Sequence, residues 1–119
     1  SNHHLYFGNT SYGIHVVHST GVMNFVSNTS TRLSISNGGH VNVTSDFLPT
    51  SDNSSNLGSS SKRWANIHSA DLHLSNEGTG GNDIDGTEGN WTIQEGEQDL
   101  YLLNNKNGKK YRFKLEEIR

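Results

Sequence analysis

The stretch that decides the fold class is Leu33-Ser-Ile-Ser-Asn-Gly-Gly-His-Val-Asn-Val43. Apolar and polar residues alternate on both sides of its Asn-Gly-Gly turn signal. Leu33 and Ile35 therefore share one face of their strand, and Val41 and Val43 share one face of theirs. The opposite faces carry small polar residues. This alternation is typical of a β-sheet that is buried on one face only.

Short runs of the same kind surround this unit within residues 1–48. The expected strands are Ile14–His18, Val22–Val26, Leu33–Ser36 and Val41–Thr44. Gly, Asn, Ser and Thr separate them, and these residues tolerate turn geometry. The spacing of about 8–10 residues fits either an antiparallel meander or successive rungs of a triple β-helix. The sequence leaves both arrangements open.

Residues 71–119 predict a small antiparallel terminal sheet. Its expected strands are Asp71–Leu74, Asn90–Gln94, Asp99–Leu103 and Lys110–Leu115. The last two form the clearest hairpin, because Asn107-Gly108 lies in their connection and is a strong hairpin signal. The first two are separated by the long loop 77–90. Loops of that length are often functional or mobile.

Residues 49–70 read as a junction between the two strand-rich regions. Pro49 cannot donate a backbone hydrogen bond, so it ends strand pairing. Asp52-Asn-Ser-Ser-Asn56 is typical of turns. Ser59-Ser-Ser-Lys-Arg-Trp-Ala-Asn66 predicts one short helix with a Ser at its N-cap. Trp64 and Ile67 share one face of that helix, and Trp64 is the expected anchor of a local core.

The composition indicates a chain that needs partners in order to fold. Only 29% of the 119 residues are apolar, which is too few to offset the backbone entropy of folding in isolation. Yet the strand-like alternation and sparse charge argue against disorder. We therefore expect burial against identical copies.

The chain has no cysteine, so disulfides and thiolate chemistry are excluded. We also expect no membrane insertion, because no apolar run is long enough to span a bilayer.

Charge is distributed unevenly along the sequence. Acidic residues and no Lys or Arg occupy 71–99, whereas most basic residues follow from Lys106 onward. We expect these blocks to pair across adjacent strands. An anionic-receptor site on the basic tail is the alternative. The net charge of −3 argues against nucleic acid as a partner.

Cofactor and enzyme signatures are weak. Asp83, Asp85 and Glu88 could ligate Ca²⁺, but they lack the rest of an EF-hand pattern and are read as part of a Gly/Asp turn. The seven histidines could form metal rings only on a threefold axis, and we assign no metal and no cofactor. Phosphate-loop, nucleophile-elbow and zinc-protease motifs are absent. Paired carboxylates near 95–99 could in principle serve glycan hydrolysis, but charge pairing explains them. The prediction is that the protein is not an enzyme.

One segment resembles a known family. Residues 49–67 have the form P-x-x-D-N-x-x-N-L-G-S-S-x-x-R-W-x-x-I. This form resembles a segment near the end of bacteriophage tail-fibre and virion-appendage proteins, particularly fibre proteins of the marine-phage type. A looser likeness continues through 71–77, 91–95 and 103–111, so it covers about the C-terminal 70 residues. The residues that carry it at the junction are Pro49, Asp52, Leu57, Gly58, Arg63 and Trp64.

The resemblance implies a mostly β, homotrimeric protein. Residues 1–48 would form an intertwined β-shaft of the triple β-helix or β-prism kind, 49–70 the short-helix junction, and 71–119 a β knob. The chain would be the distal part of a trimeric fibre or spike, assembled in the host cytoplasm and placed on the virion exterior. Its partners would be two identical copies and virion proteins upstream. Because the sequence begins Ser1-Asn2, we expect a longer chain to precede it.

The knob would present a host-attachment tip. Candidate receptor-binding residues are Asn82, Asp83, Asp85, Asn90 and Trp91, and Asn/Asp side chains beside an aromatic ring favour a host-surface glycan. The alternatives are a capsid- or neck-attached decoration fibre with no receptor site, and a fragment of a glycan-degrading tailspike. In many fibres a self-cleaving chaperone domain follows this segment, and no such domain follows it here.

Overall fold

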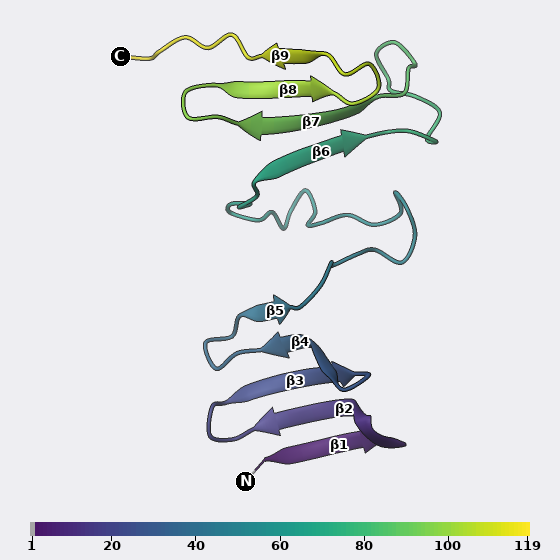
Figure 1. Cartoon of the computed structure of the whole chain (residues 1–119), viewed down its shortest axis with the longest axis vertical. Helices are drawn as coiled ribbons and strands as arrows, with labels where there is room; N and C mark the ends of the chain where they lie inside the picture. Colours follow the sequence, from purple (N-terminus) through teal and green to yellow (C-terminus); the bar gives the residue numbers. More distant parts are fainter. Residues whose placement is uncertain (1) are drawn as a thin grey trace. The chain divides into compact units, whose positions relative to one another are not determined.

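The computed structural model describes residues 2–119, and within them the protein is all-β and has no helix. Nine strands form two antiparallel sheets (Figure 1). The first sheet contains β1 (His3–Phe7), β2 (Asn9–Val17), β3 (Val22–Ser27), β4 (Ser30–Ile35) and β5 (Val41–Val43). The second contains β6 (Asp71–Ser75), β7 (Asn90–Glu95), β8 (Leu100–Asn104) and β9 (Lys110–Arg112). The predicted β class is therefore confirmed.

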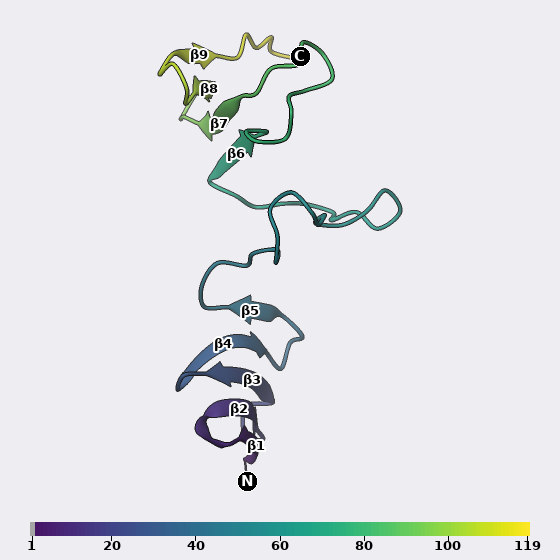
Figure 2. The same ribbon diagram turned by 90° about the vertical axis from the view of Figure 1, so that its right-hand side faces the viewer.

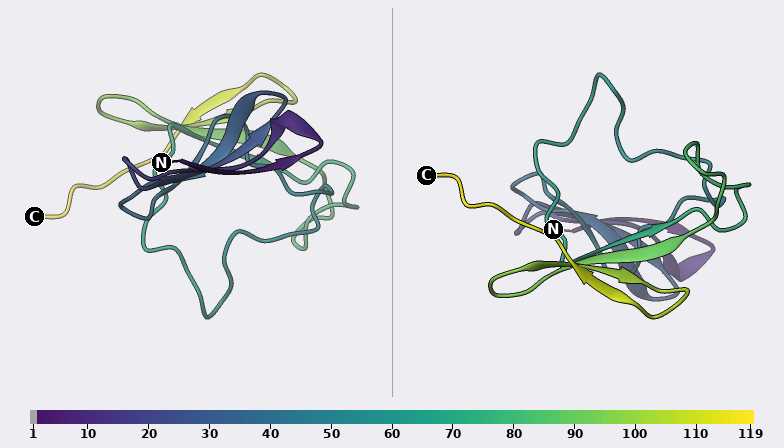
Figure 3. Two further views of the ribbon diagram at one scale, coloured as in Figure 1. Left: turned by 90° about the horizontal axis from the view of Figure 1, so that it is seen from below. Right: turned by 90° about the horizontal axis from the view of Figure 1, so that it is seen from above.

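Each sheet is a meander in which every strand pairs with its neighbour in sequence. Of the two arrangements left open for residues 1–48, the single chain adopts the antiparallel meander. The chain divides into two compact units between Leu57 and Gly58, a position inside the junction expected over 49–70. The views in Figures 2 and 3 show no regular element between β5 and β6.

The first sheet has one apolar and one mainly polar face. Cross-strand partners share a face, and their register gives two apolar rows. One row is Leu5, Ile14, Phe25, Leu33 and Val43; the other is Val16, Met23, Ile35 and Val41. A polar row, His4, His15, Asn24, Ser34 and Asn42, lies on the opposite face. The faces assigned to Leu33–Ile35 and Val41–Val43 from the sequence are thus confirmed.

The sequence missed β1. Its His3-His4-Leu5-Tyr6-Phe7 run carries aromatic rings on both faces and so lacks clean alternation. The structure shows what those rings do. His4 packs edge-on against His15 with centroids 4.6 Å apart, and His3 stacks on His18 at 4.4 Å. Cross-strand ring contacts of this kind stabilise a strand pair without an apolar core.

The helix predicted over Ser59–Asn66 does not form in the described chain. Ser59 and Lys62 instead exchange backbone hydrogen bonds of 3.0 and 3.3 Å, and Ser59 Oγ accepts a third from the Lys62 amide at 3.1 Å. This closed four-residue turn uses the Ser59 carbonyl and reverses the chain, so no i to i+4 ladder can start there. The serine caps a turn rather than a helix.

The junction residues are exposed in the single chain. Pro49, Asp52, Leu57 and Arg63 all lie on the surface. Trp64, the expected core anchor, is 62% exposed, although its indole lies against Gly58. Asp52 lies in the expected turn, where Asn53 has a φ of 50°. Among residues 2–119 no apolar side chain is fully buried.

Candidate functional site

The loop that joins β6 to β7 is tied together at its base by Asn76. The Asn76 carboxamide oxygen accepts a hydrogen bond from the Gly89 amide at 2.6 Å, and its nitrogen donates to the Thr87 carbonyl at 3.2 Å. The Asn76 amide in turn donates to the Gly89 carbonyl at 3.2 Å. One side chain therefore joins the two ends of the loop and continues the β6–β7 pairing beyond the sheet.

The tip of this loop is braced by Asn82 and Asp85. Asn82 Oδ1 accepts hydrogen bonds from the amides of Ile84 and Asp85, and Asn82 Nδ2 donates to Asp85 Oδ1 at 2.7 Å. Asp85 Oδ1 also accepts from the Thr87 amide and hydroxyl at 3.0 and 2.8 Å. These side-chain bonds add to two backbone hydrogen bonds, from the Asn82 amide to the Thr87 carbonyl and from the Gly86 amide to the Asn82 carbonyl, and together they brace the tip.

Two carboxylates of the loop are stabilised in their charged form. Hydrogen bonds from the Thr87 amide, then from the Thr87 hydroxyl and Asn82, lower the pKa of Asp85 below its ordinary value. Amides of Gly78 and Gly80 lower the pKa of Glu88, with a smaller contribution from the Lys106 charge. Both effects follow from hydrogen bonds that favour the ionised carboxylate. The carboxylates of Asp85 and Glu88, considered above as Ca²⁺ ligands, thus already accept hydrogen bonds from within the loop. This is what a Gly/Asp turn requires.

The predicted receptor residues separate into two groups. Asn82, Asp85 and Trp91 line a groove of about 620 Å³ between the loop and the adjoining strand ends. Asp83 and Asn90 do not line it. Asn90 instead donates to Glu77 at 3.1 Å and accepts from Asn105 at 2.9 Å. Asp83 lies at the loop tip beside Ile84, whose side chain is 94% exposed.

Trp91 belongs to the apolar face of the second sheet. It pairs with Leu74 on β6, and its ring lies 5.8 Å from that of Tyr111 at a tilt of 40°. Gly89 leaves space beside the indole, because a Cβ there would approach the indole nitrogen to 3.1 Å. The tryptophan is therefore held mainly by packing within the sheet and touches the groove with one edge.

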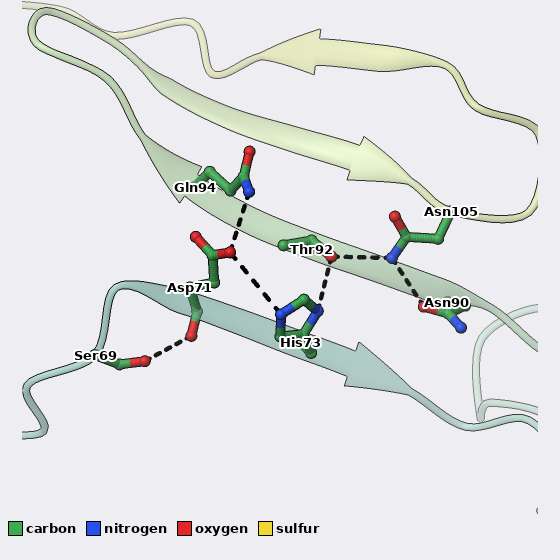
Figure 4. Close-up of polar contacts among 7 residues, drawn as sticks. All are labelled: Ser69, Asp71, His73, Asn90, Thr92, Gln94 and Asn105. Atoms are coloured by element: carbon green, nitrogen blue, oxygen red, sulfur yellow. Dashed lines mark hydrogen bonds and ion pairs between the residues drawn. The ribbon is translucent and has the colours of Figure 1, made fainter.

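The opposite face of the same sheet carries a polar network that the sequence reading did not predict (Figure 4). At its centre is Thr92, only 3% exposed. Its hydroxyl lies 3.0 Å from His73 Nδ1 and accepts from Asn105 Nδ2 at 2.9 Å. Gln94 donates to Asp71 at 3.1 Å, and His73 Nε2 faces the same carboxylate at 4.0 Å. The sequence signal for this network was the spacing of Asp71-x-His73 and Thr92-x-Gln94, which places both residues of each pair on the same face of their strand.

An acid, an imidazole and a hydroxyl in series could suggest nucleophilic catalysis. The burial of Thr92 argues against that use, because a hydroxyl that is 3% exposed does not reach a substrate. Asn105 donates to the Thr92 oxygen, and the histidine tautomer decides whether the Thr92 hydroxyl or His73 Nδ1 donates in the bond between them. The series therefore cross-links β6, β7 and the β8–β9 turn.

The expected pairing of acidic and basic blocks is seen at one cross-strand ion pair in the described residues. Arg112 Nη1 lies 3.6 Å from Asp99 Oδ2, and both side chains are partly exposed. Lys106 contacts the acidic loop through its ammonium, which donates to the Glu88 carbonyl at 3.1 Å. The β8–β9 hairpin forms with Gly108 at a φ of 72° in its turn, but β9 ends at Arg112 and not at the predicted Leu115.

Comparison with known proteins adds no relative. No protein-family model matches the chain, and neither a curated protein nor a solved structure matches it. Among residues 2–119 no helix is long and apolar enough to cross a membrane. Within the same residues, no three metal-ligating side chains lie close enough together to hold an ion.

Proposed function

We propose that this protein is a structural component of a phage virion, the distal part of a homotrimeric fibre or spike that presents a host-attachment tip. The observation that carries the proposal is an unburied apolar face on each sheet, with no covering layer inside its unit. Domains bury such faces against a second layer. Each unit builds such a face and does not cover it with its own residues, which favours a partner that does.

The exposed area gives the scale of that requirement. The chain exposes 10310 Å², whereas a compact monomer of its mass exposes about 6,400 Å² and two separate compact domains about 7,700 Å². At least about 2,600 Å² per chain is therefore in excess, or about 5,200 Å² for two chains, which is the size of a large obligate subunit interface. Identical copies supply matching apolar faces, and the resemblance at Pro49–Ile67 favours three of them.

The host-contact role is assigned to the loop between β6 and β7. Preorganised loops bind with less loss of conformational entropy than mobile ones, and Asn76, Asn82 and Asp85 brace this loop through their side chains. Its tip exposes Asp83 and Ile84. Three copies would act together, so that weak single contacts add through effective concentration.

Two measurements test the proposal. Light scattering of the purified chain is expected to give about 39 kDa, three times the 13.1 kDa of one chain. Immunogold labelling of the phage particles with an antibody to the chain is expected to mark an external appendage. A folded monomer would contradict the trimer, and unlabelled particles would contradict the virion role.

A further inference from the structure

We propose that Trp91 is buried between copies of this chain, in an interface formed by the apolar face of β6–β9. This deepens the proposed function, because it rests on self-association and specifies which surface of the second unit provides it. It also removes Trp91 from the receptor contacts predicted by the sequence. The partners are the same faces of the other copies, which would meet around the axis of the proposed trimer.

The register of the second sheet defines that face. One row runs Leu72, Ile93, Leu102 and Tyr111, and the next begins with Leu74 and Trp91. Leu72 is 52% exposed, Leu74 49% and Tyr111 46%. Large aromatic and aliphatic side chains this accessible, contiguous across four strands, are what the centre of a subunit interface contains.

Most of the charge lies on the other face, and Glu95 at the end of β7 is the exception. Asp71, His73, Lys110 and Arg112 all occur in the rows that alternate with the apolar ones. On the apolar side the polar residues are at the ends of the strands, where Asn104 pairs with Trp91 and Glu95 with Leu100. A central patch without charge needs no complementary charge from its partner, so an identical patch fits it.

The exposed area argues for a copy rather than a small ligand. The excess of at least about 2,600 Å² is spread over both units of the chain, and an area of that size exceeds what a bound small molecule covers and is typical of an obligate interface. The groove beside Trp91 then becomes the rim of the interface. The braced loop projects from that rim, and Ile84 at its tip remains available to other partners.

The absence of cysteine gives a direct test. Single variants Ile93→Cys and Gln94→Cys place one thiol on each face of the same strand, at two half-buried neighbours. Both are treated with a maleimide at native concentration, with light scattering on the same samples. We expect both variants to be oligomeric and the I93C thiol to react at least about tenfold more slowly than the Q94C thiol.

The outcomes separate this inference from the proposed function. If both thiols were labelled equally fast in an oligomer, the interface at the apolar face of β6–β9 would be contradicted. The proposed oligomeric fibre would not be. A protected I93C thiol in a monomer would mean that the face is covered within one chain, which overturns both. A Trp64→Phe chain, in which Trp91 is the remaining tryptophan, supplies a second readout. Its emission should shift to longer wavelength as the oligomer dissociates, and an unchanged emission would contradict burial between copies.

Discussion

The two sheets share a meander topology but differ in what holds their polar faces. In the described part of the first unit, through Leu57, no hydrogen bond joins two side chains, and the polar row is supported by the edge-on ring contact of His4 with His15. In the second unit, side-chain hydrogen bonds centred on Thr92 link three parts of the chain. In the proposed oligomer, the first sheet would therefore depend more on contacts with other copies, whereas the second sheet is held partly by side-chain bonds within one chain.

The largest effect is expected from a charge on the apolar face of the first sheet. Phe25→Asp places a carboxylate in the middle of the row from Leu5 to Val43. Burial without a partner charge should cost at least about 3 kcal/mol per copy. We expect loss of the oligomer by light scattering and rapid proteolysis. Asn24→Asp, on the opposite face of β3, is the matched control. Equal masses for the two variants would show that this face is not buried.

A smaller loss is expected at the centre of the polar network. Thr92→Val keeps the side-chain shape but leaves His73 Nδ1 and Asn105 Nδ2 without their common partner. An unsatisfied buried group costs about 1–3 kcal/mol, so the urea midpoint of the second unit should fall. Thr20→Val removes an exposed hydroxyl that makes only a 3.4 Å contact and should change nothing. An unaltered midpoint in T92V would mean that the network does not stabilise the sheet.

The brace at the loop tip should respond to acid. The pKa of Asp85 is lower in the folded chain than its ordinary value. The hydrogen bonds of its carboxylate therefore contribute fully to stability above the pKa of the unfolded chain. That contribution is lost as the pH falls through the pKa of the folded chain. The Thr87 amide proton should therefore titrate by NMR with a midpoint below 3.8, the ordinary value. Asp85→Asn should abolish that titration. A midpoint at or above 3.8 in the native chain would contradict the hydrogen-bonded carboxylate.

The smallest effect on stability is expected at Ile84. Its side chain is 94% exposed, so Ile84→Ser should shift the free energy of unfolding by no more than about 0.5 kcal/mol. Ile93→Ser, on the apolar face of β7, should weaken the oligomer. If the loop contacts the host, soluble I84S should compete with phage adsorption less well than the native chain. Equal competition would remove Ile84 from the contact.

The sequence predicted what depends on local alternation and turn chemistry. The strands around Leu33–Val43 and the Asn107-Gly108 turn could be read directly, because a period of two and a left-handed turn residue are local properties. The prediction of a helix near Trp64 was wrong, because a serine that caps a turn cannot be told in sequence from a serine that caps a helix. The face of Trp91 was readable from its alternation with Thr92. The contact of Thr92 with Asn105 required the strand register, which spacing alone does not fix.

Pairing between sequence neighbours has a consequence for how the protein assembles. Each strand of either sheet pairs with the next strand in sequence, and apart from the long β6–β7 connection the intervening stretches are short, which gives the low contact order of fast-folding proteins. Single hairpins form in about 1–10 μs, so strand pairing proceeds at a rate independent of protein concentration. In the proposed oligomer, covering the apolar faces with other copies would instead be a bimolecular step. Dilution should therefore slow assembly while leaving the early kinetic phase unchanged, and local crowding of nascent chains would set how long the uncovered faces persist.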